Sequence, residues 1–357
     1  MTFKMKKKPT LYSLIKTESI ISANNGDVIN EIRNMGTLSS VFDVYYNNDI
    51  YDPQKKQLGI KDQLGPSREY DFYYIRNNPD VFKSIRGKKI IMAYPYDEDM
   101  FKSASAVFVT TPNWKNHLQK NGIDSEEKLK YLYKTLTHSY EGLPYDFKCP
   151  VINTWQRTDQ DIVDKVSTKK DLFKFEAETT GAKIFGYYGN LSKNLYPYMG
   201  FAAIKNLHRD FPEHSPTVIL AGKFRKGGEI ADKNIIHIGN VDYDDMPSLI
   251  DVSTATFTTE SLLCNTLGSQ KVLDSISRGV PVLCRKLDTF VSQLGDNYPC
   301  FYESENEAYD LAKNLLMDKD FSEDVRKFCL ERSKYHSQNE VIKRFLDQPE
   351  LKSLLES

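Results

Sequence analysis

The stretch Leu267-Gly-Ser-Gln-Lys-Val-Leu-Asp-Ser-Ile-Ser-Arg-Gly-Val-Pro-Val-Leu283 decides the fold class of this chain. Ser269 is a good N-cap residue, and apolar residues then recur at helical spacing over 272–276. Gly279 suits the left-handed position that ends a helix, and the apolar run after it is typical of a buried parallel strand. The stretch therefore predicts a loop, a helix, a tight turn and a buried strand.

The amino end of this helix predicts an anion site. It is formed by Gly268, Ser269 and Gln270, and the first turn of a helix offers N–H groups and a partial positive charge. Lys271 adds a full positive charge, and Asp274 lies one turn later, where its carboxylate can accept hydrogen bonds from vicinal hydroxyls. A phosphate at the helix start and sugar hydroxyls at the carboxylate describe a nucleotide diphosphate. A Ser-capped helix with one Lys and one Asp is also common without any ligand.

Size and composition exclude several classes of protein. The 357 residues are enough for two domains, and a net charge of −1 gives no overall field for nucleic acid or anionic membrane. The 5 cysteines form no C-x-x-C pair, which favours free thiols in a reducing compartment over a zinc site. No apolar run approaches a membrane span. We expect a cytoplasmic protein, with the basic segment 1–9 either a solubilising tail or a contact with the inner face of a membrane.

Strand and helix patterns alternate along the whole chain. This alternation predicts doubly wound parallel sheets. The predicted domains are 1–165 and 166–335, followed by a helical tail at 336–357. The predicted strands are 10–15, 40–46, 70–75, 88–94, 104–111 and 149–153, then 183–189, 217–222, 235–240, 254–259, 280–283 and 298–302.

The stretch 269–282 resembles the motif of retaining GT-B glycosyltransferases of the family-4 type. One subgroup of that family reads roughly Pro-Ser/Asn-Lys-x-x-Glu-x-x-Ala-x-Gly-x-Pro-Val, and here Asp274 replaces the Glu whose carboxylate binds the ribose of the donor. The resemblance covers the C-terminal half well and the N-terminal half loosely. It implies an α/β protein of the GT-B fold, with two Rossmann-like domains facing a central cleft and a tail that packs back towards the first domain.

The resemblance also implies which other loops contact the donor. Family members carry a strand–Gly–Arg/Asn loop with a Lys downstream, and a later loop touches the nucleotide base through backbone groups. A basic loop after the strand at 217–222 offers a further cation for the diphosphate, or is simply solvated. The residues so implied are Gly189, Asn190, Lys193, Arg225, Gly239, Asn240 and Val241.

The acidic triplet Asp97-Glu98-Asp99 follows a predicted strand in the first domain. Asp97 could bind an acceptor sugar or act as a base, or the triplet could be an acidic turn at a helix start. It matches D-x-D by letters, but GT-B enzymes characteristically lack a metal-holding D-x-D. The resemblance therefore implies no metal and no cofactor, with the nucleotide-diphosphate sugar as a substrate.

The leading interpretation is a hexosyl- or pentosyltransferase that moves a sugar from a nucleotide-diphosphate donor to a glycan, a lipid or another acceptor. The resemblance implies retention at the anomeric carbon, with Lys271 and Lys193 stabilising the departing diphosphate. Three alternatives stay open: a nucleotide-sugar epimerase of the same fold, a catalytically silent nucleotide-sugar binder, and a DNA-modifying glycosyltransferase. The near-zero net charge disfavours a nucleic acid acceptor.

Overall fold

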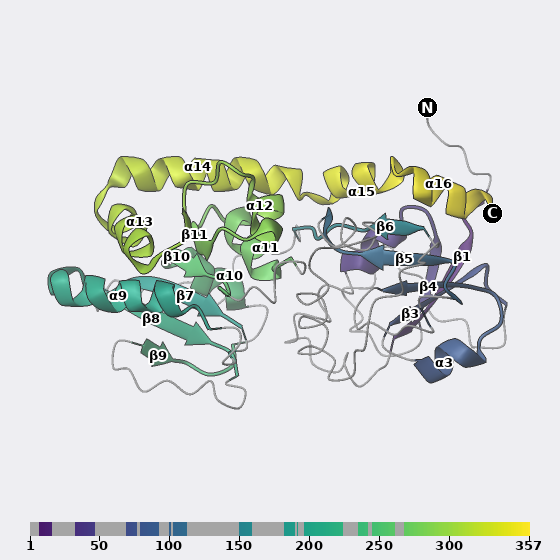
Figure 1. Ribbon diagram of the computed structural model, residues 1–357, viewed down its shortest axis with the longest axis horizontal. Helices are drawn as coiled ribbons and strands as arrows, with labels where there is room; N and C mark the ends of the chain where they lie inside the picture. Colours follow the sequence, from purple (N-terminus) through teal and green to yellow (C-terminus); the bar gives the residue numbers. More distant parts are fainter. Residues whose placement is uncertain are drawn as a thin grey trace. The chain divides into compact units, whose positions relative to one another are not determined.

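The chain divides into two compact units, the first made of Met1–Gln156 with Asn339–Ser357 and the second of Arg157–Gln338. The sequence predicts these boundaries at 165/166 and 335/336. The computed structural model describes residues 7–15, 33–46, 69–76, 79–92, 100, 103–112, 150–158, 182–189, 191, 196–223, 235–241, 245–260 and 268–357. Each unit has its own six-stranded sheet (Figure 1).

The sheet of the first unit is parallel throughout. Helix α3 (Pro79–Ser84) joins two of its strands, where the sequence predicts only a turn, and residues 33–38 are helical. The spatial order of the strands is β2 (Asp43–Tyr46), β1 (Thr10–Ile15), β3 (Phe72–Arg76), β4 (Lys88–Met92), β5 (Ala106–Val109) and β6 (Val151–Asn153).

The last two helices, α15 (Gln338–Leu346) and α16 (Pro349–Glu356), complete the core of the first unit. Phe345 and Leu351 are buried in the same cluster as Phe108 of β5. Between the helices, the side chain of Gln348 binds the backbone of Asn153 in β6: Asn153 N–H donates to Oε1 at 2.8 Å, and Nε2 donates to the Asn153 carbonyl at 2.7 Å. Residues at the end of the chain therefore satisfy the backbone of an edge strand.

The sheet of the second unit is also parallel throughout. Its spatial order is β12 (Phe301–Tyr302), β11 (Val282–Arg285), β10 (Ser253–Phe257), β7 (Lys183–Tyr188), β8 (Pro216–Ala221) and β9 (Ile235–His237). Its described helices are α9 (Tyr198–Asp210), η3 (Pro212–His214), α10 (Met246–Asp251), α11 (Gln270–Ser277), α12 (Asp288–Leu294), α13 (Glu305–Met317) and α14 (Lys319–Tyr335). The predicted alternation into two doubly wound parallel sheets is confirmed.

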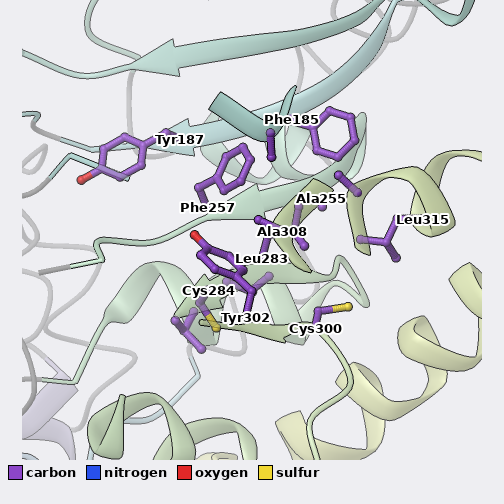
Figure 2. Packing of buried hydrophobic residues seen from close by; sticks show 14 of the residues in the cluster. Phe185, Tyr187, Ala255, Phe257, Leu283, Cys284, Cys300, Tyr302, Ala308 and Leu315 are labelled. Atoms are coloured by element: carbon purple, nitrogen blue, oxygen red, sulfur yellow. The ribbon is translucent and has the colours of Figure 1, made fainter. Parts of the chain in front are cut away.

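The core of the second unit is built on the central strands and the helices beside them (Figure 2). The rings of Phe185 in β7 and Phe257 in β10 lie 6.3 Å apart, and α9 contacts α13. Three cysteines in this unit, Cys284, Cys300 and Cys329, are buried and form no disulfide. Burial raises the pKa of Cys329 to about 12 and also raises the pKa of the other two thiols, so all three stay protonated and unreactive at neutral pH.

Candidate functional site

The strand order of the second sheet reverses between β7 and β10. From β7 the chain runs to β8 on one side, whereas β10 and β11 follow each other on the other side (Figure 1), with β12 beyond β11. Open parallel sheets bind ligands outside the carboxyl ends of their strands at such a point. Gly189 directly follows β7, Glu260 lies just past β10, and α11 begins later in the connection from β10 to β11. These residues therefore follow the strands at the edge of the sheet where a ligand is expected.

Helix α11 has the extent that the sequence predicts. Val272 and Leu273 are fully buried, and Gly279 has φ +72°, as the predicted helix end requires. Ser269 stands at the N-cap position with an extended backbone, but its side chain makes no capping hydrogen bond. The position of the cap is confirmed, while the expected hydroxyl cap is wrong, and hydrogen bonds to the backbone of Ser269 hold it. The side chain of Gln293 in α12 accepts from Ser269 N–H and donates to Ser269 O, both at 3.0 Å.

Lys271, in the first turn of α11, lies across Gly189 at the end of β7. A Cβ built on Gly189 would lie 2.2 Å from Cε and 2.8 Å from Nζ of Lys271. Gly189 also has φ +148°, a conformation that other residues rarely adopt. The ammonium lies 5.5 Å from the centre of the Tyr187 ring. The structure thus brings together two residues that the sequence implicates separately, and a glycine is needed for that approach.

Gln270 and Asp274 lie on the same side of α11. The Nε2 group of Gln270 donates to Asp274 Oδ1 at 3.2 Å and to the carbonyl of Arg157 at 3.2 Å. Asp274 is half-buried. The predicted pairing of a helix start with an acid one turn later is therefore present, and Gln270 fixes the position of that acid.

Glycines end the neighbouring strands β7, β8 and β9. Gly189 N–H donates to the carbonyl of Ala221 at 2.6 Å, and Gly222 N–H donates to that of Gly239 at 2.7 Å. A Cβ on Gly239 would meet no atom within 4 Å, and its φ of +77° alone favours glycine there. Asn240 is exposed. The predicted base loop therefore lies at the same edge of the sheet as Gly189, two strands away.

The half-buried Val241 ends the described part of this loop. It packs against a small cluster of buried residues that includes Leu249 and Ile250 of α10. Val241 thereby anchors the predicted base loop to the helix that follows it. The half-buried Gly268 likewise ends the connection that leads into α11.

Glu260 is a buried carboxylate just past β10, and the sequence gives it only a weak link to the donor site because it lies fourteen residues before Asp274 and not eight. It is 7% exposed, and it accepts hydrogen bonds from the N–H groups of Met199 at 3.0 Å and Gly200 at 2.8 Å in the first turn of α9. The Tyr302 hydroxyl donates to it at 2.7 Å, and burial followed by the charge of Glu260 raises the pKa of that hydroxyl. The amino end of α9 is therefore neutralised by the protein's own carboxylate. The amino end of α11 is bound by the neutral amide of Gln293 instead.

Four predicted site residues, Asn190, Lys193, Arg225 and Asp97, lie outside the described residues. Among the described residues, no group of three or more His, Cys, Asp or Glu side chains could hold a metal ion. None of the helices in the described ranges has the length and apolar character to cross a membrane.

Solved structures share the architecture of this chain. Sucrose-phosphate synthase of Thermosynechococcus elongatus aligns over 98% of this chain and 100% of its own, with a TM-score of 0.61 and 9% identity. Anabaena HepE, solved with UDP and glucose, aligns over 96% of this chain and 99% of its own, with a TM-score of 0.59 and 12% identity. A glycosyltransferase of Rickettsia africae aligns over 99% and 100%, with a TM-score of 0.59 and 12% identity.

The chain has the GT-B fold. No protein-family model and no curated protein matches its sequence. At 9% and 12% identity, the likeness is one of fold, and activity must be argued from the site. In this GT-B chain, the described part of the candidate site is the edge of the second sheet at Gly189, Lys271 and Asp274.

Proposed function

We propose that this protein is a glycosyltransferase that binds a nucleotide-diphosphate sugar on its second unit and transfers the sugar to an acceptor. The observation that carries the proposal is the placement of Lys271 across Gly189, beside the amino end of α11 and at the reversal of strand order. A cation and a helix start together favour a diphosphate. The UDP found with HepE, a protein of the same fold, supports this choice of ligand.

The chemistry follows from the charge that develops on the leaving diphosphate. Lys271 and the partial charge of the α11 start stabilise that charge, and groups fixed in advance do so without reorganising during the reaction. We assign Asp274 to the ribose hydroxyls and the loop at Gly239 to the base. In this proposal, Lys193 supplies a second positive charge for the diphosphate, and Asp97 binds the acceptor sugar or acts as a base.

Several finer features of the proposal come from the sequence resemblance. They are retention at the anomeric carbon, independence from metal and cofactor, and a glycan or lipid-linked acceptor. The acceptor belongs to the first unit in this scheme. Location in the cytoplasm, with the possibility of contact at the inner face of a membrane, is part of the same proposal.

A thermal-shift screen with UDP, GDP, ADP, CDP and dTDP tests the donor site. One of these nucleotides should raise the melting temperature of the protein, and Lys271→Met should abolish most of that rise without unfolding the chain. Lys327→Met is the matched control, because Lys327 is exposed on α14 and pairs with Asp324 at 3.4 Å. If none of the five nucleotides stabilises the wild type, the donor site is wrong.

Product analysis with the sugar of the selected nucleotide then tests the reaction. Transfer to an added acceptor supports a glycosyltransferase. Conversion of the sugar without any acceptor identifies an epimerase, and binding without turnover identifies a silent binder.

A further inference from the structure

Gln293, in the last turn of α12, binds both backbone groups of Ser269, the residue before α11. The two bonds, both 3.0 Å long, use the oxygen and the nitrogen of the side-chain amide, and Gln293 is only 3% exposed. Little water can replace them. We propose that Gln293 is a positioning residue that sets the place of the amino end of α11, and with it the cation of Lys271; the inference rests on the proposed function.

The backbone of Gln293 is itself fixed by residues from α14 and its end. Its carbonyl accepts from Arg332 Nε at 2.7 Å and from His336 Nε2 at 2.8 Å. Arg332 Nη2 also donates to the carbonyl of Ser292 at 2.9 Å. The amide that holds Ser269 is therefore anchored to a long helix and is not free to follow a moving loop.

Further hydrogen bonds connect these residues to the two segments where the chain enters and leaves the second unit. The carbonyl of His336 accepts from Thr158 N–H at 2.9 Å and from Thr158 Oγ1 at 3.2 Å. Gln270 donates to the carbonyl of Arg157, the first residue of the unit. The amino end of α11 is thus bonded, directly or through Gln293 and His336, to both of these segments. Gln293 is the residue through which Ser269 is connected to them.

The two bonds of Gln293 satisfy the backbone of Ser269, as those of Gln348 satisfy the backbone of Asn153. What distinguishes Gln293 is the residue that it holds, because Ser269 opens α11 and the first turn of that helix carries Lys271. A diphosphate site needs accurate placement, because a binding group displaced by about 1 Å loses much of its effect. The partner of Gln293 therefore favours a role in positioning the proposed diphosphate site.

Gln293→Met tests the inference, with Gln348→Met as a matched control. Both residues are buried, at 3% and 6% exposure, and both bind the N–H and carbonyl of one residue through the side-chain amide. Gln348 binds Asn153 of the first unit, whereas the described residues of the proposed donor site belong to the second. The two variants should lower the melting temperature to a similar extent.

Two measurements separate the variants. Hydrogen exchange of the peptide covering 268–273 should become at least tenfold faster in Gln293→Met and stay unchanged in Gln348→Met. The dissociation constant for the nucleoside diphosphate that stabilises the wild type most, among UDP, GDP, ADP, CDP and dTDP, should rise about tenfold in Gln293→Met alone. Unchanged exchange at 268–273, or equal affinity in Gln293→Met and the wild type, would overturn the inference and leave the proposed function intact. A wild type that binds none of the five nucleotides refutes the proposed function, and the inference falls with it.

Discussion

Replacement of Gly189 by Ala should separate donor binding from folding. The new Cβ would lie 2.2 Å from Lys271 Cε, whereas two carbon atoms pack at about 3.5–4.0 Å. The end of Lys271 must therefore move by about 1.5 Å. Because that end is flexible, the displacement is accommodated by the lysine and not by the sheet.

Two free-energy changes follow from this substitution. Holding Ala at φ +148° costs about 1–3 kcal/mol of unfolding free energy, which corresponds to about 2–4 °C in melting temperature per kcal/mol. Loss of a charge-assisted hydrogen bond from Lys271 to the diphosphate costs about 1.5–3 kcal/mol of binding free energy. At about 1.4 kcal/mol per tenfold, the dissociation constant should rise about 10- to 150-fold.

Calorimetric titration of the selected nucleoside diphosphate measures the binding change, and differential scanning calorimetry measures the folding change. Gly87→Ala is the control for backbone strain, because Gly87 in the first unit has φ +119° and its Cβ would approach only the Tyr73 ring, at 3.3 Å. It should lower the melting temperature without changing the dissociation constant.

A double-mutant cycle makes the test specific to the lysine. In a Lys271→Met background, Gly189→Ala should have little further effect on binding, because the two changes remove the same interaction. A Gly189→Ala variant that binds the nucleotide within twofold of the wild type would refute the assignment of Lys271 to the diphosphate.

Three further substitutions test the fold, two of them in the second unit and one in the first. Gly279→Ala should lower the free energy of unfolding by about 1–2 kcal/mol in a denaturant titration, because φ is +72° and the Cβ would lie 3.1 Å from Arg326 Cγ; no loss would contradict the helix end. Glu260→Gln should lower the free energy of unfolding by about 1–3 kcal/mol, because one N–H donor at the start of α9 loses its acceptor. A Glu260→Gln variant as stable as the wild type would exclude a capping role for this carboxylate. The backbone N–H of Thr10, and to a smaller extent its hydroxyl, donates to Asp71 and lowers the pKa of that carboxyl. The stability that these bonds give is complete above the unfolded pKa of about 3.9, and it is lost as pH falls through the lower folded pKa. Asp71→Asn should therefore cost at most about 1 kcal/mol at pH 7, since the side chain is exposed, and the difference from the wild type should shrink as pH falls below about 3.9; a difference independent of pH would contradict this.

The helix α11 and the strands could be predicted because their signals are local. A period of apolar residues and a glycine at the helix end lie within one short stretch, as at Gly279. The short helix α12, with seven residues, escaped prediction. That omission also hid Gln293, whose role depends on a contact with Ser269 across the fold.

The contacts of Glu260 likewise could not be predicted from the sequence. The sequence places it after a strand, but its partners Met199 and Gly200 belong to another helix. No spacing in the sequence predicts that a carboxylate past β10 caps α9. The pairing exists because β10 lies beside β7 in the sheet.

The sequence by itself determined two alternating series of strands and helices, the extent of α11, and the charged residues at its start. The tertiary structure decided that Lys271 lies on Gly189, that Gln270 bonds to Asp274 and Arg157, and that Gln293 holds Ser269. Periodicity and capping act between near neighbours along the chain, so the sequence contains them directly. The contacts of the site depend on which strands lie side by side, and that order is set by the packing of the whole sheet.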